Sequence, residues 1–505
     1  MIKRAFLYNI LIYIAIIFVS FLGAVYITPH LFKNIQENIT ILIYAKIIIF
    51  TLAMYMFLVV KRMFIKEITA EAFFIISIIP LSIIYLMLFC PWNTPDSTQH
   101  ISASYRFSNI ILGNDDWKTT SNDMQYFSKI YKKYDSSNPK KEAYIALIDN
   151  FLKPTKGISE ENNINFPMVV KKMEFYSILN YIPFVSGLCF GRLLDIPVQY
   201  SLYIGRILMM LLYVLGGYYA IKRMPFFKNI VAIILLIPMS IMYSSAISYD
   251  GICLIASLNF VASLMQLNKN YTTRNAIESC VFAFILGAIK GGGYGILLLL
   301  VFTINKNHHN RIAAILCIVF SYIISVLLFN YYIPDNNSLF QLGYAPNKLS
   351  ASFAIEEPLK YISMLCNTYK MFYQILMYQM IGSLSHLEHV VSEPIVYLFY
   401  ILIFIMALGE KNELTLNTKI IYLFTYIVFS IVMPVMLLCE SYKGMVFISG
   451  VQGRYFLPVF ISLLISFPNL NKKYNKLNLD KVCLISFVIL SIYFTYSISK
   501  LYLER

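Results

Sequence analysis

Residues 72–100 read AFFIISIIPLSIIYLMLFCPWNTPDSTQH. The first part of this stretch, residues 72–90, carries no charged side chain and is close to the length of about 20 residues that a helix needs to cross the hydrocarbon layer of a membrane. Because lipid offers backbone groups no hydrogen-bond partner, this apolar part is expected to be helical. The polar residues 91–100 follow at once. The stretch therefore predicts a membrane-spanning helix that opens directly into a polar loop.

Comparable apolar runs recur along the chain, separated by short polar stretches. Hydrophobic residues make up 59% of the 505 positions and charged residues 13%, which is about half the charged share of a soluble domain. We therefore predict an all-α polytopic membrane protein with about 11–13 transmembrane helices. The predicted spans are residues 5–27, 39–60, 72–90, 199–222, 231–245, 252–267, 276–290, 293–304, 312–330, 394–408, 419–438, 455–469 and 481–499.

Basic residues set the expected orientation of these spans. Lys3 and Arg4 precede the first span, and Lys61 and Arg62 follow the second, so both places are expected in the cytoplasm. The third span then leads outward. A basic cluster after residue 221 returns the chain to the cytoplasm, so the intervening region is expected to be external. The N-terminus is thus predicted to be cytoplasmic and the large loop after the third span external.

The charged loops also divide the chain into parts. Inside the large external loop, the apolar pieces 144–152 and 175–194 are too short or too interrupted to cross a membrane, and they are expected to form interfacial or re-entrant helices. The expected divisions are residues 1–90 (first three transmembrane helices), 91–198 (large external loop with interfacial helices), 199–333 (central transmembrane helices with a KGGG break), 334–393 (second external loop) and 394–505 (C-terminal transmembrane helices).

Composition also excludes several kinds of partner. The net charge is +15, but Lys and Arg are scattered over short loops, so they indicate topology and lipid headgroup contacts, and no nucleic-acid partner is predicted. The eight cysteines show no metal-ligand spacing and no disulfide framework. His386, Glu388 and His389 lack the rest of a known metal motif. The sequence thus indicates no metal site and no cofactor, and a divalent metal is left open.

Asp96 and His100 stand at the start of the large loop, within a few residues of the membrane surface. An Asp held there can accept a proton from a sugar hydroxyl, while His100 can orient it or bind substrate. The alternative is that Asp96 and Ser97 after Pro95 simply form a helix cap or a turn. We place Asp96 and His100 as candidate catalytic residues and keep that alternative open.

Three further candidates are expected at the same membrane face. Arg206 lies near the outer end of its span, and Tyr249 and Asp250 precede the next inward span. Charged groups near a span are costly unless they face a cavity or a partner. Arg206 could instead extend to the lipid headgroups. We predict that all three residues bind substrate.

Two more cations complete the predicted site. Arg454 follows Gly453 directly before a span, so its planar fork could grip phosphate oxygens while the glycine lets a ligand approach closely. Lys290 starts the break KGGG, which resembles the discontinuous helices that line polar cavities, and it could be a second anion ligand. The alternatives are a basic residue that merely flanks a span for Arg454, and a solvated turn for Lys290.

Five motifs carry a resemblance. PDSTQH at 95–100, GRILMMLLY at 205–213, PMSIMYSSAISYD at 238–250, KGGGY at 290–294 and VQGRYFLP at 451–458 resemble a bacterial family of polytopic membrane proteins without assigned function, over roughly residues 90–460. Asp96 and His100 match that family's first motif. Ser97 stands where the family usually has a second acidic residue, so a mechanism with two carboxylates there is not expected.

The resemblance implies a fold and an activity. In architecture the family is similar to the GT-C glycosyltransferases, whose first outer loop begins with a catalytic Asp or Glu and whose donors are polyprenyl-linked sugars. Length, composition and topology also resemble the serotype-converting O-antigen glucosyltransferases, which modify lipopolysaccharide on the periplasmic side. The implied location is the bacterial inner membrane.

Two classes of function follow. The first is a membrane hexosyltransferase that moves a sugar from a polyprenyl-phosphate donor to a saccharide acceptor of the O-antigen type, with Asp96 as general base and cations holding the departing phosphate. The second is a flippase or transporter of lipid-linked saccharide, since KGGG and short half-spans are typical of broken helices in carriers. A polysaccharide polymerase would use the same kind of outer site as a transferase.

Overall fold

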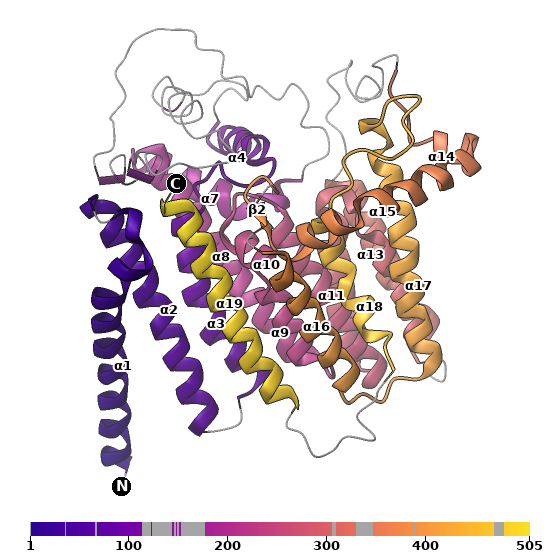
Figure 1. Cartoon of the computed structure of the whole chain (residues 1–505). Coiled ribbons are helices and arrows are strands. Elements are labelled where there is room, and N and C mark those ends of the chain that lie inside the picture. Colours follow the sequence, from indigo (N-terminus) through magenta and orange to yellow (C-terminus); the bar gives the residue numbers. More distant parts are fainter. Residues whose placement is uncertain are drawn as a thin grey trace.

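The apolar runs of the sequence fold into long helices that lie side by side, as Figure 1 shows. This computed structural model describes residues 2–35, 37–65, 68–113, 123, 144–145, 148, 151–152, 177–305, 310–329, 347–387, 389–390, 392–468 and 479–504. The two ends of the chain lie at opposite ends of the helical bundle (Figure 1). The prediction of an all-α polytopic membrane protein is confirmed.

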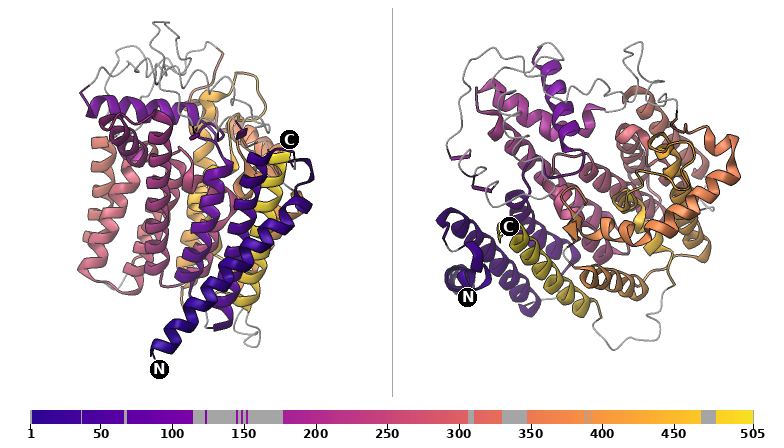
Figure 2. Two further views of the ribbon diagram at one scale, coloured as in Figure 1. Left: turned by 90° about the vertical axis from the view of Figure 1, so that its left-hand side faces the viewer. Right: turned by 45° about the horizontal axis from the view of Figure 1, so that its top comes forward.

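Up to residue 288, every described element is a helix. The elements in chain order are α1 (Ile2–Leu31), η1 (Lys33–Ile35), α2 (Ile39–Ile65), α3 (Ala70–Leu88), α4 (Ser97–Ile111), η2 (Ile178–Asn180), α7 (Ile182–Leu193), α8 (Val198–Arg223), α9 (Lys228–Leu236), α10 (Pro238–Ser245), α11 (Asp250–Lys269) and α12 (Thr273–Ala288). Figure 2 shows α4 lying across the end of the bundle, at a steep angle to the long helices.

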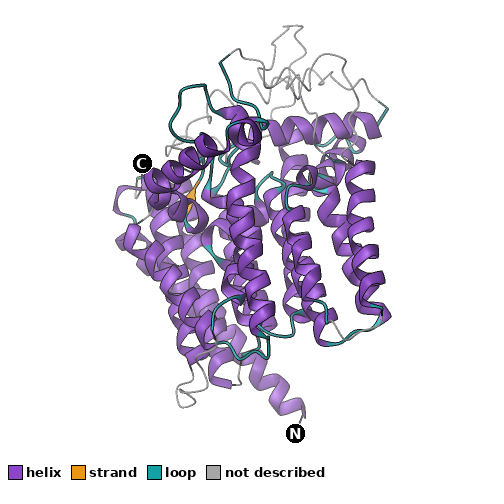
Figure 3. Cartoon of the chain, turned by 90° about the vertical axis from the view of Figure 1, so that its right-hand side faces the viewer, coloured by secondary structure: helices purple, strands orange, loops and turns teal. Residues whose placement is uncertain are grey.

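The second half adds shorter and more irregular pieces. These are η3 (Lys290–Gly292), η4 (Gly295–Thr303), α13 (Arg311–Phe329), α14 (Phe353–Glu356), α15 (Pro358–Ile381), α16 (Glu393–Gly409), α17 (Leu416–Val432), η6 (Met433–Glu440), η7 (Gly453–Phe456), α18 (Leu457–Ile465) and α19 (Leu479–Glu504). Strands β1 (Ser383–Leu384) and β2 (His389–Val390) pair antiparallel. Helices otherwise dominate the part of the chain that is described, as Figure 3 shows.

The number of spans depends on how short helices are counted. In the described part of the chain, eight helices are long and apolar enough to cross a membrane, or nine if the bent pair α9 and α10 forms one span. The expected number of about 11–13 also includes four shorter apolar segments: α12, η4, α16 and the unit formed by η7 and α18. Each of these has fewer residues than a helix usually needs to span the hydrocarbon layer.

Burial separates a central helix from those on the outside. In α11, 94% of the most apolar stretch of 18 residues is buried inside the protein. The same share is 11% in α1, 17% in α13 and 22% in the segment that contains α17. An apolar helix that is buried on all sides belongs to the core, and one with exposed apolar faces suits lipid. Asp250, the first residue of α11, therefore lies at one end of the centre of the bundle.

A broken span leads into this central helix. Helices α9 and α10 meet at an angle of 67°. Pro238 stands at the start of α10, where its missing N–H removes a helical hydrogen bond and favours the break. After α10 the chain bends through residues 246–249 and enters α11. The break brings the end of α10 and the start of α11 to the same end of the bundle as α4.

Candidate functional site

Asp96 stands at the end of a tight turn between α3 and α4. The backbone N–H of Asn93 donates to the carbonyl of Cys90 at 3.0 Å, and the hydroxyl of Ser97 donates to the carbonyl of Trp92 at 2.9 Å. Asp96 has a left-handed φ of 56° and precedes the first residue of α4, but its side chain does not cap that helix. The side chain is 46% exposed. Asp96 therefore stands at the cap position of α4, as the alternative reading of the sequence proposed, but its carboxylate does not cap the helix.

The carboxylate of Asp96 binds Arg454, which is the centre of the site. The Arg454 side chain is 2% exposed, although a guanidinium carries five N–H donors that need partners. All three of its nitrogens are hydrogen-bonded by side chains. Nη2 contacts Asp96 Oδ2 at 2.6 Å and the Tyr455 hydroxyl at 3.4 Å, Nη1 contacts Asp250 Oδ2 at 3.1 Å and the Tyr243 hydroxyl at 3.3 Å, and Nε contacts Gln452 Oε1 at 2.5 Å.

Gly453 fixes the direction of Arg454. A Cβ at position 453 would lie 1.8 Å from the carbonyl oxygen of Leu376 in α15, which no side chain can do. The backbone N–H of Gly453 also donates to Gln379 Oε1 of α15 at 2.9 Å. The glycine therefore allows η7 to pack closely on α15. The sequence had instead suggested that it lets a ligand approach. This packing places Arg454 over the end of α11.

Asp250 joins the two cations of the site. Its Oδ2 binds Arg454, and its Oδ1 lies 3.3 Å from Nζ of Lys290. The Asp250 side chain is 11% exposed. It stands in the first turn of α11, where the partial positive charge of the helix end stabilises a carboxylate. Asp96, Arg454, Asp250 and Lys290 thus form one chain of ion pairs, which we call the charged cluster.

The KGGG segment places Lys290 in this cluster. Lys290, Gly291 and Gly292 have positive φ values of 46°, 61° and 72°, so the chain makes a left-handed turn that glycine favours. The Tyr322 hydroxyl donates to the carbonyl of Gly292 at 2.6 Å, and the N–H of Lys290 donates to Asn180 Oδ1 at 3.0 Å. The Lys290 side chain is 22% exposed, and it pairs with Asp250 rather than standing in a solvated turn.

Tyrosine rings surround the ammonium of Lys290. Its Nζ lies 4.3 Å from the ring centre of Tyr455, 5.1 Å from that of Tyr249 and 5.6 Å from that of Tyr294. A cation within about 6 Å of an aromatic face is attracted to it. Tyr249 therefore belongs to the site through its ring. The three rings hold the ammonium in place beside Asp250.

His100 lies beside the charged cluster but does not pair with Asp96. Its Nδ1 is 2.9 Å from the hydroxyl of Tyr181, and its ring packs edge-on against Tyr249 with 4.7 Å between centres. Burial lowers the pKa of His100 to about 4, against an opposing effect of Asp250 and Asp96. The imidazole is therefore neutral at physiological pH. It adds no positive charge to the site, and it does not orient Asp96 by a hydrogen bond as the sequence suggested.

Comparison with known families identifies the chain. Residues 114–463, more than half of the chain, match the model of a family described as predicted membrane protein (DUF2142). The chain belongs to the DUF2142 family. Asp250, Lys290 and Arg454 lie inside the range matched by the DUF2142 model, whereas Asp96 and His100 precede it, so the match is shorter at its start than the roughly 90–460 expected. Neither the curated proteins nor the solved structures contain a match to this DUF2142 protein.

Arg206 is not part of the charged cluster. Its side chain is completely buried, and its guanidinium donates to the carbonyl of Ser245 at 2.6 Å and to that of Phe89 at 2.7 Å. These bonds tie α8 to the ends of α10 and α3. The structure thus shows Arg206 holding these helices together, and its binding of substrate stays a prediction.

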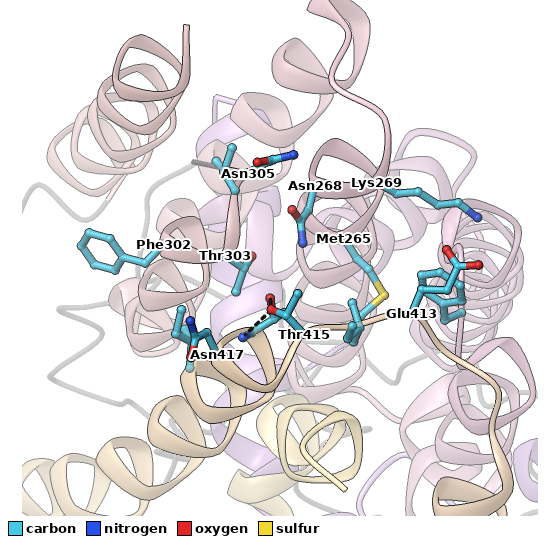
Figure 4. Close-up of a pocket in the computed structure, with 14 residues that line it drawn as sticks. Met265, Asn268, Lys269, Phe302, Thr303, Asn305, Glu413, Thr415 and Asn417 are labelled. Atoms are coloured by element: carbon cyan, nitrogen blue, oxygen red, sulfur yellow. Dashed lines mark hydrogen bonds between the residues drawn. The ribbon is translucent and has the colours of Figure 1, made fainter. Parts of the chain in front are cut away.

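A cavity lies at the other end of α11. Its volume is about 400 Å³, and Figure 4 shows Met265, Asn268 and Lys269 of α11 on its wall. Phe226, residues 302–305 at the end of η4 and residues between 413 and 421 around the start of α17 complete the lining, which contains no member of the charged cluster. The 20 residues of α11 separate the two places by about 30 Å. No group of three or more His, Cys, Asp or Glu side chains suited to a metal occurs among the described residues.

Several site residues were not singled out from the sequence. Tyr243, Tyr294 and Tyr455 lie inside the three motifs 238–250, 290–294 and 451–458, so the motifs themselves were a usable signal. Tyr181 belongs to the piece expected to be interfacial or re-entrant, and nothing in its neighbourhood marks it. Of that piece the structure describes residues 177–194, and of the piece 144–152 it describes five residues. Their relation to a membrane surface stays a prediction.

Proposed function

We propose that this chain is a membrane glycosyltransferase that moves a hexosyl group from a polyprenyl-phosphate donor to a saccharide acceptor of the O-antigen type. The observation that supports this most directly is the pairing of a half-exposed carboxylate, Asp96, with a buried guanidinium, Arg454. A second cation, Lys290, is held beside the first by Asp250. A base and two cations next to each other are what this reaction needs.

The chemistry assigns a role to each group. The acceptor hydroxyl oxygen attacks the anomeric carbon, the bond from that carbon to the phosphate oxygen breaks, and the hydroxyl proton passes to the Asp96 carboxylate. The departing phosphate gains negative charge. Arg454 and Lys290 stabilise this charge, and they do so more strongly in a site with little water than in bulk solvent. Attack from the side opposite the phosphate inverts the anomeric configuration.

The location follows from the same arrangement. The donor is a lipid, so its phosphate sits at a membrane surface, and the charged cluster lies at one end of the helical bundle beside α4. We place this end on the periplasmic side of the bacterial inner membrane, with the N-terminus in the cytoplasm, because basic residues flank the first two spans on the other side. The acceptor then approaches from the periplasm.

Replacement of Asp96 tests the base role. Purified Asp96→Asn protein in detergent or proteoliposomes is assayed for transfer of labelled hexose from polyprenyl phosphate to lipopolysaccharide. We expect a loss of about 100-fold or more, since general-base catalysis contributes about 10²–10⁴. Asp195→Asn is the matched control, because Asp195 is exposed and also has a positive φ, of 51°. Transfer at the wild-type rate by folded Asp96→Asn protein removes Asp96 from the base role. Product length separates a single-sugar transferase from a polymerase.

A carrier of lipid-linked saccharide is the second candidate. Two breaks between helices lie at the site. Tyr243, which contacts Arg454, lies on α10 of the bent pair, and Lys290 lies in the left-handed turn between α12 and η4. Broken helices with polar groups are typical of binding sites in carriers. Flipping of a labelled lipid-linked sugar across proteoliposomes without any transfer to acceptor favours the carrier, and transfer without flipping favours the enzyme.

A further inference from the structure

The guanidinium of Arg454 has no free donor for a ligand. Its five N–H groups meet five side chains, two of which are the carboxylates of Asp96 and Asp250. A phosphate group that binds Arg454 must therefore replace one of these partners. Replacement of a neutral partner such as the Tyr243 hydroxyl would add an anion next to two carboxylates, which like-charge repulsion opposes. The partner that leaves is therefore a carboxylate.

The two carboxylates differ in how firmly they are held. Asp250 is 11% exposed and binds both Arg454 and Lys290, so its removal would leave two cations without their shared partner. Asp96 is 46% exposed and binds one cation. A half-exposed carboxylate regains water when it leaves, so its ion pair is broken at a lower cost than that of a buried carboxylate. Asp96 is therefore the partner that a ligand displaces most easily.

The charge balance defines the kind of ligand. The two carboxylates and the two cations of the charged cluster cancel, and His100 beside them is neutral at physiological pH. A phosphodiester carries one negative charge, so it replaces the charge of Asp96 one for one. One of its oxygens would take the place of Asp96 Oδ2 at Nη2 of Arg454. A neutral sugar would leave a buried guanidinium donor without an anion, which costs free energy.

We infer that Asp96 occupies, in the unliganded protein, an anion site at Nη2 of Arg454, and that the phosphate of the ligand displaces it. The catalytic part of this inference, which follows, rests on the proposed function. Once displaced, the Asp96 carboxylate has lost its cation and stands beside the bound donor, free to take the proton of the acceptor hydroxyl. Binding of the donor thus releases the base, and an acceptor that arrives without a donor meets a carboxylate still paired with Arg454.

Removal of the internal carboxylate tests the inference by affinity. The binding of a short-chain polyprenyl phosphodiester and of inorganic phosphate is measured by calorimetry at about pH 6, where both carry mainly one negative charge. Wild-type, Asp96→Asn and Asp96→Gly proteins are compared. Asn and Gly both accept the positive φ of position 96, so the backbone is retained. We expect binding to become about fivefold tighter in both variants, since the ligand no longer competes with Asp96. Tightening toward both probes assigns the site to the phosphate group, and tightening toward the lipid alone shows that the chain is required.

The controls separate this inference from the proposed function. Asp195→Asn should bind like the wild type, and Arg454→Lys, which loses the fork of donors, should bind more weakly. Unchanged or weaker binding by folded Asp96→Asn and Asp96→Gly proteins overturns the inference, and a loss of transfer in the same proteins would leave the proposed base role standing. Tighter binding with undiminished transfer would support the displacement of Asp96 by phosphate and would contradict its role as the base.

Discussion

Asp96 and Arg454 are 358 positions apart in the chain, and their side chains form an ion pair with 2.6 Å between Oδ2 and Nη2. The pair is unequal, since the Asp96 side chain is half exposed and that of Arg454 is buried. Loss of Asp96 leaves Arg454 with Asp250 as a counter-charge, whereas loss of Asp250 leaves Lys290 without its carboxylate. The effects of substitutions in the charged cluster should follow this inequality.

Asp250→Asn should destabilise the protein as well as abolish its activity. The substitution keeps the shape of the side chain but leaves two largely buried cations with less negative charge, and removal of one partner of a buried ion pair costs about 3–5 kcal/mol. Thermal unfolding in detergent measures the effect against Asp195→Asn. Unfolding of Asp250→Asn at the wild-type temperature would contradict the central place of Asp250.

Gly453→Ala should disrupt the site from outside the charged cluster. The added Cβ would meet the backbone of Leu376 at 1.8 Å, so η7 must move away from α15 and carry Arg454 with it. We expect a loss of about 2 kcal/mol of stability or more, together with weaker phosphate binding. Gly23→Ala is the control, because its nearest contact would be a side-chain atom of Ile27 at 3.9 Å. Equal melting temperatures for the two variants would show that the clash is relieved elsewhere.

His100 should make stability depend on pH. The folded-state pKa of about 4 lies below the ordinary value of about 6.5, so the folded protein keeps His100 neutral where the unfolded chain protonates it. The stabilisation is complete above pH 6.5 and is lost as the pH falls from about 6.5 to 4, by up to about 3 kcal/mol.

His100→Gln provides the comparison, because glutamine does not titrate. Unfolding by denaturant is measured from pH 7.5 to 4 for the wild type and the variant, and the difference between the two curves isolates His100. We expect this difference to change through the window from pH 6.5 to 4. A constant difference across the whole range would contradict the prediction, because it would show that folding does not shift the pKa of His100 within this window.

Arg206→Met should lower stability without changing ligand binding. The variant loses two charge-assisted hydrogen bonds and leaves the carbonyls of Phe89 and Ser245 without them, at a cost of about 3 kcal/mol. Binding of polyprenyl phosphate to the protein that remains folded should match the wild type, in contrast to Arg454→Lys. A stable Arg206→Met protein that fails to bind would support Arg206 as a substrate ligand.

Much of the fold could be predicted because its causes are local. Helix α3 and the turn after it follow from residues 69–100 alone, since the capping Thr69, the apolar length and the prolines around the turn act over a few neighbours. Span number was harder to predict. The bend of 67° between α9 and α10 and the short η4 show that apolar composition does not fix how far a segment continues in one direction.

The sequence by itself determined that charged side chains gather at one end of an α-helical membrane protein. Hydropathy and the charge of loops depend only on neighbouring residues, so both can be recognised in the sequence. Only the tertiary structure decided which of them meet. The charged cluster forms because η7 packs on α15 through Gly453 and because the KGGG turn is left-handed. Arg206 instead donates its hydrogen bonds to the carbonyls of Phe89 and Ser245. Ion pairing depends on distances of a few ångströms between distant parts of the chain, and these are set by packing rather than by sequence order.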